Sequence, residues 1–142
     1  MEKFKYFEHT ADVEFEAYGK NLEETFENAA LVTSEVMTDT KKVEPKTEEK
    51  ISIESEDLKS LLYDFLEKLL ILFDSKNLVF SEFKVNYIKK ENDKFKLEAS
   101  FSGEEFNPKK HESRTHVKAI TYHQMDVGKK NGKHFIHVIL DI

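Results

Sequence analysis

Residues 7–15, Phe7-Glu8-His9-Thr10-Ala11-Asp12-Val13-Glu14-Phe15, join a short polar cluster to a segment with the period of a β-strand. From Val13 to Tyr18, apolar side chains at odd positions alternate with more polar ones, which is the pattern of a half-buried strand. Asp12 begins this strand on its polar face. A second apolar strand ends at Asp141, and a carboxylate at the end of such a strand needs a partner. The sequence therefore raises the question of whether Asp12 and Asp141 meet.

Length and composition favour one domain that spans residues 1–142. The chain has 142 residues, and its twelve Phe, with the Leu, Ile and Val, supply enough apolar volume for a core of its own. Because 35% of the residues are charged, the surface is expected to be well solvated. Cysteine is absent, which excludes disulfides, thiolate metal sites and cysteine nucleophiles and fits a reducing compartment.

No apolar run approaches the about 18 residues of a membrane span, and Met1–Lys5 lacks the apolar core of a secretion signal. We therefore expect a cytoplasmic protein without a membrane partner. The net charge of -6 argues against a broad phosphate-binding surface. Any connection with RNA is expected to run through a partner protein.

Two helices are predicted from apolar spacing and capping residues. The first runs from about Asn21 to Met37, with Asn21 as N-cap and Glu24 three residues later. The second follows Asp57, carries a wide stripe of Leu and Phe, and runs to about Asp74.

The remaining apolar segments predict strands, and the turns between them predict hairpins. Gly103 is expected to end the first hairpin, and the glycines of 128–132 are expected to form the turn of the second. The final strand is apolar on both faces, which favours neighbours on both sides. The predicted fold is α+β, with two helices packed on a mixed or mostly antiparallel sheet of six or seven strands, in the order β-β-α-β-α-β-β-β-β. Beyond the strand that begins near Asp12, the predicted strands are 51–55, 78–87, 95–101, 115–127 and 133–140.

Most enzyme signatures are missing from the sequence. Its four glycines form no phosphate-cradling loop, and there is no H-E-x-x-H helix or G-x-S-x-G elbow. What remains is a set of polar residues at strand ends: His9, Thr10, Asp12, His111, Lys118, Thr121, His123, His137 and Asp141.

Asp12 and Asp141 form the sharpest pair in this set. Two close carboxylates repel each other unless they are protonated or bridged by a cation. The terminal carboxylate of Ile142 would add further oxygens, and oxygen-only ligands favour Ca²⁺, Mg²⁺ or Mn²⁺. The alternative from spacing alone is that Asp12 caps a turn and Asp141 is solvated.

The segment His116–His123 is the second constellation. Alternation places Lys118 on one face and Thr121 and His123 on the other. A strand lysine usually extends its charge to solvent, and a strand histidine is usually hydrogen-bonded in a structural role. Both interpretations stay open for these residues.

Six segments of the sequence, in order from one end to the other, form a recognisable set. They are F-E-H-T-A-D-V (7–13), L-E-E-T-F-E-N-A-A (22–30), L-K-S-L-L-Y-D-F-L (58–66), G-E-E-F-N-P-K-K-H (103–111), V-K-A-I-T-Y-H (117–123) and L-D-I (140–142). With these segments the chain resembles the archease family along its whole length. The departures from the family pattern are Phe65 in place of a usual Trp, Glu67-Lys68 in place of a common polar-Glu pair, Asn107 in place of an Asp and His116 in place of a Glu. None removes a carboxylate of the Asp12 and Asp141 pair.

This resemblance implies a divalent-metal site, with calcium as the metal, on Asp12, Asp141 and Ile142. It also implies an accessory protein rather than an enzyme. Archease activates the tRNA-splicing RNA ligase of the RtcB type, promotes guanylylation of the ligase's active-site histidine and multiple turnover, and broadens its use of nucleotides. That ligase joins 2′,3′-cyclic phosphate or 3′-phosphate ends of RNA to 5′-hydroxyl ends. The supporting or ligase-contact candidates are His9, Thr10, His111, Lys118, Thr121 and His123.

Two other functions stay open at the level of sequence. One is a free-standing metal-dependent phosphoester hydrolase that uses Asp12 and Asp141 with His9 or His123 as acid or base. The other is a metal-independent chaperone or adaptor for RNA-modifying enzymes.

Overall fold

The computed structural model describes residues 2–7 and 12–142, and within them it confirms the α+β class and the predicted order of elements. The helices are α1 (Leu22–Met37), the short 3₁₀ helix η1 (Thr40–Lys42) and α2 (Leu58–Lys76). The strands are β1 (Phe4–Phe7), β2 (Asp12–Gly19), β3 (Thr47–Ser55), β4 (Leu78–Glu91), β5 (Lys94–Glu105), β6 (Ala119–Lys130) and β7 (Lys133–Asp141).

Both predicted helices begin at the expected caps. The side chain of Asn21 accepts a hydrogen bond from the backbone N–H of Glu24 at 2.8 Å. Asp57 and Ser60 form a reciprocal capping box at the start of α2. Helix α2 extends two residues beyond the predicted end and stops where Asn77 takes a left-handed conformation with φ of 57°. Each cap satisfies a backbone donor that the first helical turn leaves free.

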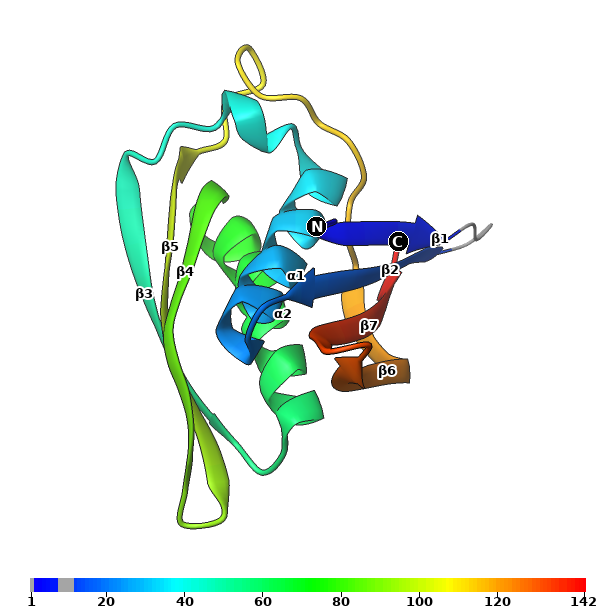
Figure 1. The fold of residues 1–142 in the computed structure, drawn as a ribbon. Coiled ribbons are helices and arrows are strands. Elements are labelled where there is room, and N and C mark those ends of the chain that lie inside the picture. The colour runs from blue at the N-terminus through cyan, green and yellow to red at the C-terminus, as the bar shows by residue number, and fades with distance from the viewer. Residues whose placement is uncertain (1, 8–11) are drawn as a thin grey trace.

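The strands form two antiparallel sheets among the described residues, so the prediction of one sheet was wrong. A four-stranded sheet has the order β1-β2-β7-β6, and a three-stranded sheet has the order β3-β5-β4. Figure 1 shows both helices between the two sheets. Helix α1 packs on β2 and β4, and α2 packs on β6 and β3, so each helix is covered from both sides. A single sheet covers only one side of such a helix layer, and the wide apolar stripe of α2 needs two.

Two predicted strand boundaries were also wrong. Gly103 does not end the first hairpin, because β5 continues through it to Glu105. The strand expected from Thr115 begins only at Ala119. The backbone N–H groups of Arg114 and Thr115 donate to the carbonyls of Met37 and Val36 at the end of α1, so this segment satisfies a helix end instead of a sheet.

The core lies at the helix layer and is rich in phenylalanine. Phe65 of α2 packs its ring against Phe26 of α1 at 5.5 Å and against Phe101 of β5 at 5.3 Å between centroids. The last strand, β7, lies between β2 and β6, as its two apolar faces predict. Within the described residues, no helix is long and apolar enough to cross a membrane.

Candidate functional site

Asp12 and Asp141 meet in the four-stranded sheet. Strands β2 and β7 are antiparallel neighbours, and the two aspartates are direct cross-strand partners in their register. Directly opposite residues project to the same face of a sheet, with Cβ atoms about 5 Å apart. Asp12 is half-buried and Asp141 is exposed. The pairing expected from the strand pattern is therefore present.

Lys118 and Ile142 adjoin this pair. The backbone N–H of Lys118 donates to the carbonyl oxygen of Asp141 at 2.8 Å, just before β6 begins beside β7. The Lys118 side chain is exposed. Ile142 follows Asp141 and packs its side chain against the core. Three strands, β2, β7 and β6, thus bring Asp12, Asp141, Ile142 and Lys118 together.

The structure places the other candidate residues apart from this pair. Thr121 lies further along β6, where its hydroxyl donates to the carbonyl of Ile139 at 3.0 Å and ties the two strands together. His123 is exposed on an irregular part of β6. His111 is buried beside Glu104 in another cluster. His9 and Thr10 lie outside the described residues.

The carboxylate oxygens of Asp12 and Asp141 suit a hard divalent cation, but the two side chains supply only part of its coordination shell. Carboxylates held on one face of adjacent strands repel each other, and a cation relieves that repulsion. Within residues 2–7 and 12–142, no group of three or more His, Cys, Asp or Glu side chains is placed to hold a metal. Calcium takes roughly six to eight oxygens, so the carboxylates of Asp12 and Asp141 would leave positions for water or for groups of a partner.

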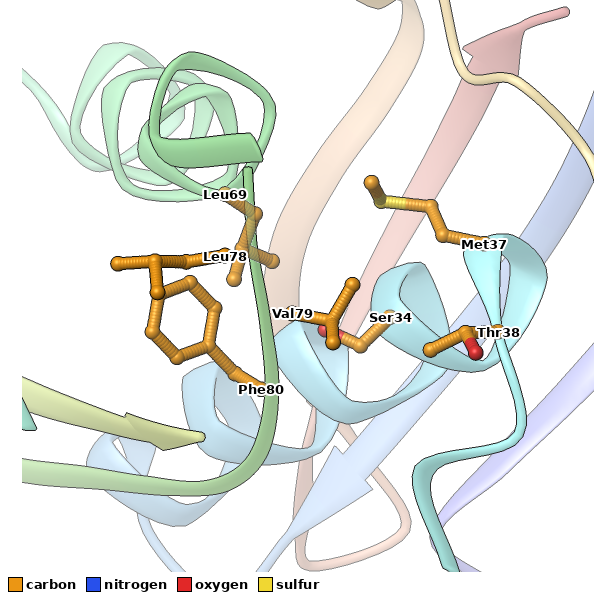
Figure 2. A pocket seen from close by; sticks show the side chains of 7 residues that line it. All are labelled: Ser34, Met37, Thr38, Leu69, Leu78, Val79 and Phe80. Atoms are coloured by element: carbon orange, nitrogen blue, oxygen red, sulfur yellow. The ribbon is translucent and has the colours of Figure 1, made fainter. Parts of the chain in front are cut away.

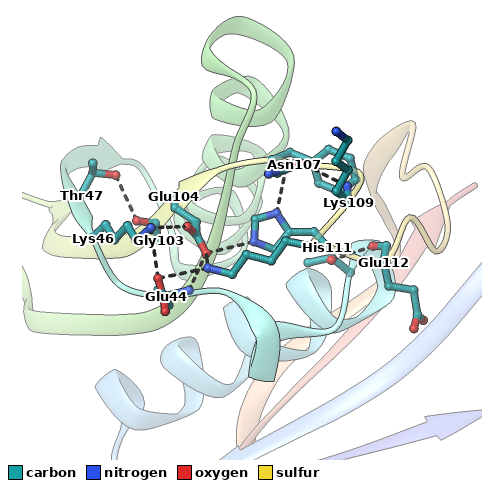
Figure 3. Close-up of polar contacts among 12 residues, drawn as sticks. Glu44, Lys46, Thr47, Gly103, Glu104, Asn107, Lys109, His111 and Glu112 are labelled. Atoms are coloured by element: carbon teal, nitrogen blue, oxygen red, sulfur yellow. Dashed lines mark hydrogen bonds and ion pairs between the residues drawn. The ribbon is translucent and has the colours of Figure 1, made fainter.

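Glu104 and His111 are both buried and form the centre of a polar cluster (Figure 3). The backbone N–H of Asn107 donates to Nδ1 of His111 at 2.8 Å, so the ring carries its proton on Nε2. That nitrogen donates to Oε2 of Glu104 at 3.0 Å. The same oxygen accepts from the Glu44 backbone at 2.8 Å and lies 2.8 Å from Lys110 Nζ. This cluster fixes the 106–111 loop to β5 and the segment before β3.

The cluster lowers the pKa of the Glu104 carboxyl group. Burial opposes ionisation of the carboxyl, but hydrogen bonds from the Glu44 backbone, Lys110, His111 and Lys46 outweigh it and lower the pKa from 4.5 to about 2. Glu104 was not among the functional residues predicted from the sequence. The available signal was its place seven residues before His111 in the G-E-E-F-N-P-K-K-H segment, although nothing in that spacing requires the contact.

Replacing Glu104 by glutamine is expected to destabilise the protein by about 2–3 kcal/mol, because buried donors lose a charged acceptor. Urea unfolding followed by circular dichroism measures this loss. The matched control is Glu105→Gln, since Glu105 is exposed and its substitution should change stability by less than about 0.5 kcal/mol. Equal losses in the two variants would contradict the role of the cluster.

Lowering the pH should remove the stabilisation that the ionised Glu104 side chain gives to the wild-type protein. The pKa of Glu104 is lower in the folded state than the ordinary value of 4.5, so its stabilisation is complete above pH 4.5 and declines as the pH falls towards about 2. The difference in unfolding free energy between wild type and Glu104→Gln should therefore shrink between pH 5 and pH 3.

A pocket near the end of α1 offers no comparable chemistry. It is lined by apolar side chains and two hydroxyl residues, and Figure 2 shows them around the start of β4. None of its lining residues carries an ionisable side chain, so we assign it no catalytic role. They are Ser34, Met37, Thr38, Leu69, Leu78, Val79 and Phe80.

Known proteins share this fold and sequence. The chain is similar to the protein archease of Sulfurisphaera tokodaii, with 49% identity over the full length of both chains. Among solved structures, protein 1598 of Methanobacterium thermoautotrophicum matches with a TM-score of 0.88 and 46% identity, and all of each chain is covered. An archease of Thermotoga maritima, described as a possible chaperone, matches with a TM-score of 0.60 and 25% identity over 97% of this chain and 96% of that one. The model of the Archease protein family (MTH1598/TM1083) matches residues 4–142, and the chain therefore belongs to this family.

Proposed function

We propose that this archease activates an RtcB-type tRNA-splicing RNA ligase by promoting guanylylation of the ligase's active-site histidine. The observation that supports the proposal most is the direct pairing of Asp12 with Asp141 at the end of the four-stranded sheet. Two charged carboxylates in such a pair repel each other, and a bound cation would relieve that repulsion.

A cation held by Asp12 and Asp141 would suit an accessory protein, because part of its coordination shell would stay open for a partner. When bound, a divalent cation would supply positive charge to neutralise nucleotide phosphates. Asp12 and Asp141 would hold it on one side, and the incomplete oxygen shell would leave its other side for the ligase and its nucleotide. The net charge of -6 suits approach to a basic RNA-binding cleft.

Replacing Asp12 by asparagine should abolish stimulation of guanylylation and leave the fold intact. Asparagine keeps the size of the side chain at a half-buried strand end, so the melting temperature should change little. The assay measures covalent guanylate on the purified ligase with GTP, at defined Ca²⁺, Mg²⁺ or Mn²⁺ concentrations. Calorimetric titration of the isolated protein with Ca²⁺ supplies a second readout, in which the variant should lose binding.

The control for this experiment is Asp93→Asn. Asp93 is an exposed carboxylate in the turn between β4 and β5, with φ of 63°, a conformation that asparagine also adopts. The Asp93→Asn variant should stimulate the ligase as the wild type does. If Asp12→Asn also stimulates fully, the two aspartates do not carry the activity.

A metal-independent adaptor is the second candidate, because a relative from Thermotoga maritima is described as a possible chaperone. Such an adaptor would stimulate equally with Asp12→Asn and would bind no Ca²⁺. A free-standing hydrolase has less support. Of the two histidines expected to act as acid or base, His123 lies on the irregular part of β6, apart from the aspartate pair, and His9 lies outside the described residues. Isolated protein should turn over no phosphoester with Mn²⁺ present.

A further inference from the structure

The edge strand β6 carries a wide bulge. Thr121 pairs with Ile139 and Asp126 pairs with His137, so residues 122–125 stand opposite the single residue Val138. Gln124 adopts a positive φ of 55° within the bulge. The segment 122–124 is exposed, whereas Met125 returns to the core. The bulge is therefore a protrusion on the surface of the sheet.

The bulge is held in place by a histidine. Nδ1 of His137 contacts the carbonyl oxygen of Gln124 at 2.8 Å, and because a carbonyl only accepts, this nitrogen carries a proton. Nε2 of the same ring lies 2.5 Å from Oε2 of Glu14. The contact joins β2, β7 and the bulge, so the exposed residues are presented on a fixed support.

Tyr122 is the most exposed of the large apolar and aromatic side chains in the described chain. Its exposed fraction is 53%, yet its ring stacks on Tyr63 of α2, with centroids 4.4 Å apart and ring planes within 8° of parallel. One face of the Tyr122 ring is thus covered and ordered, and much of the remaining ring faces solvent. An ordered aromatic side chain loses little conformational entropy on binding, which is why tyrosine is common at interface anchors.

Two carboxylates of α2 lie near this aromatic stack, because Asp64 follows Tyr63 and Glu67 lies one helical turn beyond it. Partial burial raises the pKa of the Tyr122 hydroxyl, and the negative charges of Asp64, Asp57 and Glu67 raise it further. Asp64 is held by a hydrogen bond from the Ser55 hydroxyl at 2.8 Å. An open ring face beside several carboxylates attracts cations and repels phosphates.

We infer that Tyr122, Tyr63 and the neighbouring carboxylates of Asp64 and Glu67 form a docking surface for an arginine side chain of a protein partner. The planar guanidinium stacks on an aromatic ring and pairs with a carboxylate at once, and an ammonium group does so less well. This inference rests on the proposed function in that the ligase is taken as the partner. A nucleic-acid strand is the less favoured occupant because its phosphates would face the carboxylates.

Affinity for the ligase tests the surface. Tyr122→Ala should raise the Kd of the complex about tenfold, whereas Tyr122→Phe should change it less than about twofold because the ring is kept. Glu67→Gln should raise the Kd several-fold and weaken its dependence on salt. The matched control is Tyr6→Ala, which removes a tyrosine with an exposed fraction of 46% from β1 at the opposite edge of the same sheet. A Tyr122→Ala variant that binds like Tyr6→Ala overturns the inference.

Two further measurements separate this surface from the proposed activation. Asp12→Asn should fail to stimulate the ligase even at concentrations that saturate binding, whereas Tyr122→Ala should stimulate fully once its concentration exceeds the raised Kd. Independently of the ligase, a capped Gly-Arg-Arg-Gly peptide should shift the ring NMR signals of Tyr122 and Tyr63, and the lysine analogue should shift them less. Shifts caused by an oligouridylate instead of the arginine peptide would overturn the inference even if guanylylation is stimulated.

Discussion

Gly103→Ala is expected to lower the free energy of unfolding by about 3 kcal/mol or more. A Cβ atom at this position would lie 1.8 Å from the carbonyl oxygen of Val79 and 2.6 Å from Cα of Phe80. Both atoms belong to the backbone of β4, which bulges between Phe80 and Glu82, so no rotamer change relieves the clash. The variant should unfold at clearly lower urea concentration, as followed by circular dichroism.

The control for Gly103→Ala is the same substitution at Gly128. There the three atoms nearest to an added Cβ all belong to the Phe135 ring, with Cε1 at 3.1 Å, and a side chain moves aside more readily than a backbone. Gly128→Ala should therefore stay within about 1 kcal/mol of the wild type. If the two variants are equally stable, the close approach of β4 and β5 is not what requires glycine.

Phe65→Ala has the second large expected effect, a loss of about 3–5 kcal/mol. The ring is completely buried and contacts Phe26 and Phe101, so its removal opens a cavity where both helices and the three-stranded sheet meet. The lost contacts and the cavity both lower the free energy of unfolding. Thermal and urea unfolding of the variant measure the loss.

Ile71→Ala supplies the matched truncation on the same helix. Ile71 has an exposed fraction of 46%, so its loss should cost less than about 0.5 kcal/mol. A small effect of Phe65→Ala, comparable with that of Ile71→Ala, would show that the aromatic cluster is not central to the core.

The pairing of Asp12 with Asp141 was predictable because Asp12 begins a strand with clear alternation and Asp141 ends a strand that is apolar on both faces. Alternation with a period of two shows which residues of a strand share a face. Because one acid begins its strand and the other ends its strand, antiparallel pairing of the two strands places the acids side by side. Helix caps were predictable for the same reason, since Asn21 and Asp57 satisfy nearby backbone donors in their own chain segment.

The division into two sheets was not predictable from local pattern. Whether β5 pairs with β4 alone or also with β3 depends on contacts between distant segments, and alternation carries no information on them. The start of β6 was missed because Arg114 and Thr115 bond to the end of α1, a partner far away in sequence. The bulge that presents Tyr122 depends on His137 and Glu14 in two other strands. The contact between Glu104 and His111 depends on a loop conformation that the spacing leaves free.

The pairing of β2 with β7 has a consequence for the order in which the molecule is built. The three-stranded sheet and α2 come from the continuous segment 47–105, so their contacts need only short loops to close. The other sheet joins residues near the start of the sequence to residues near its end, and closing such a long loop is slow. During synthesis, β2 cannot pair with β7 until β7 has left the ribosome. We therefore expect Asp12 and Asp141 to come together late in folding, after the segment 47–105 has formed its own sheet.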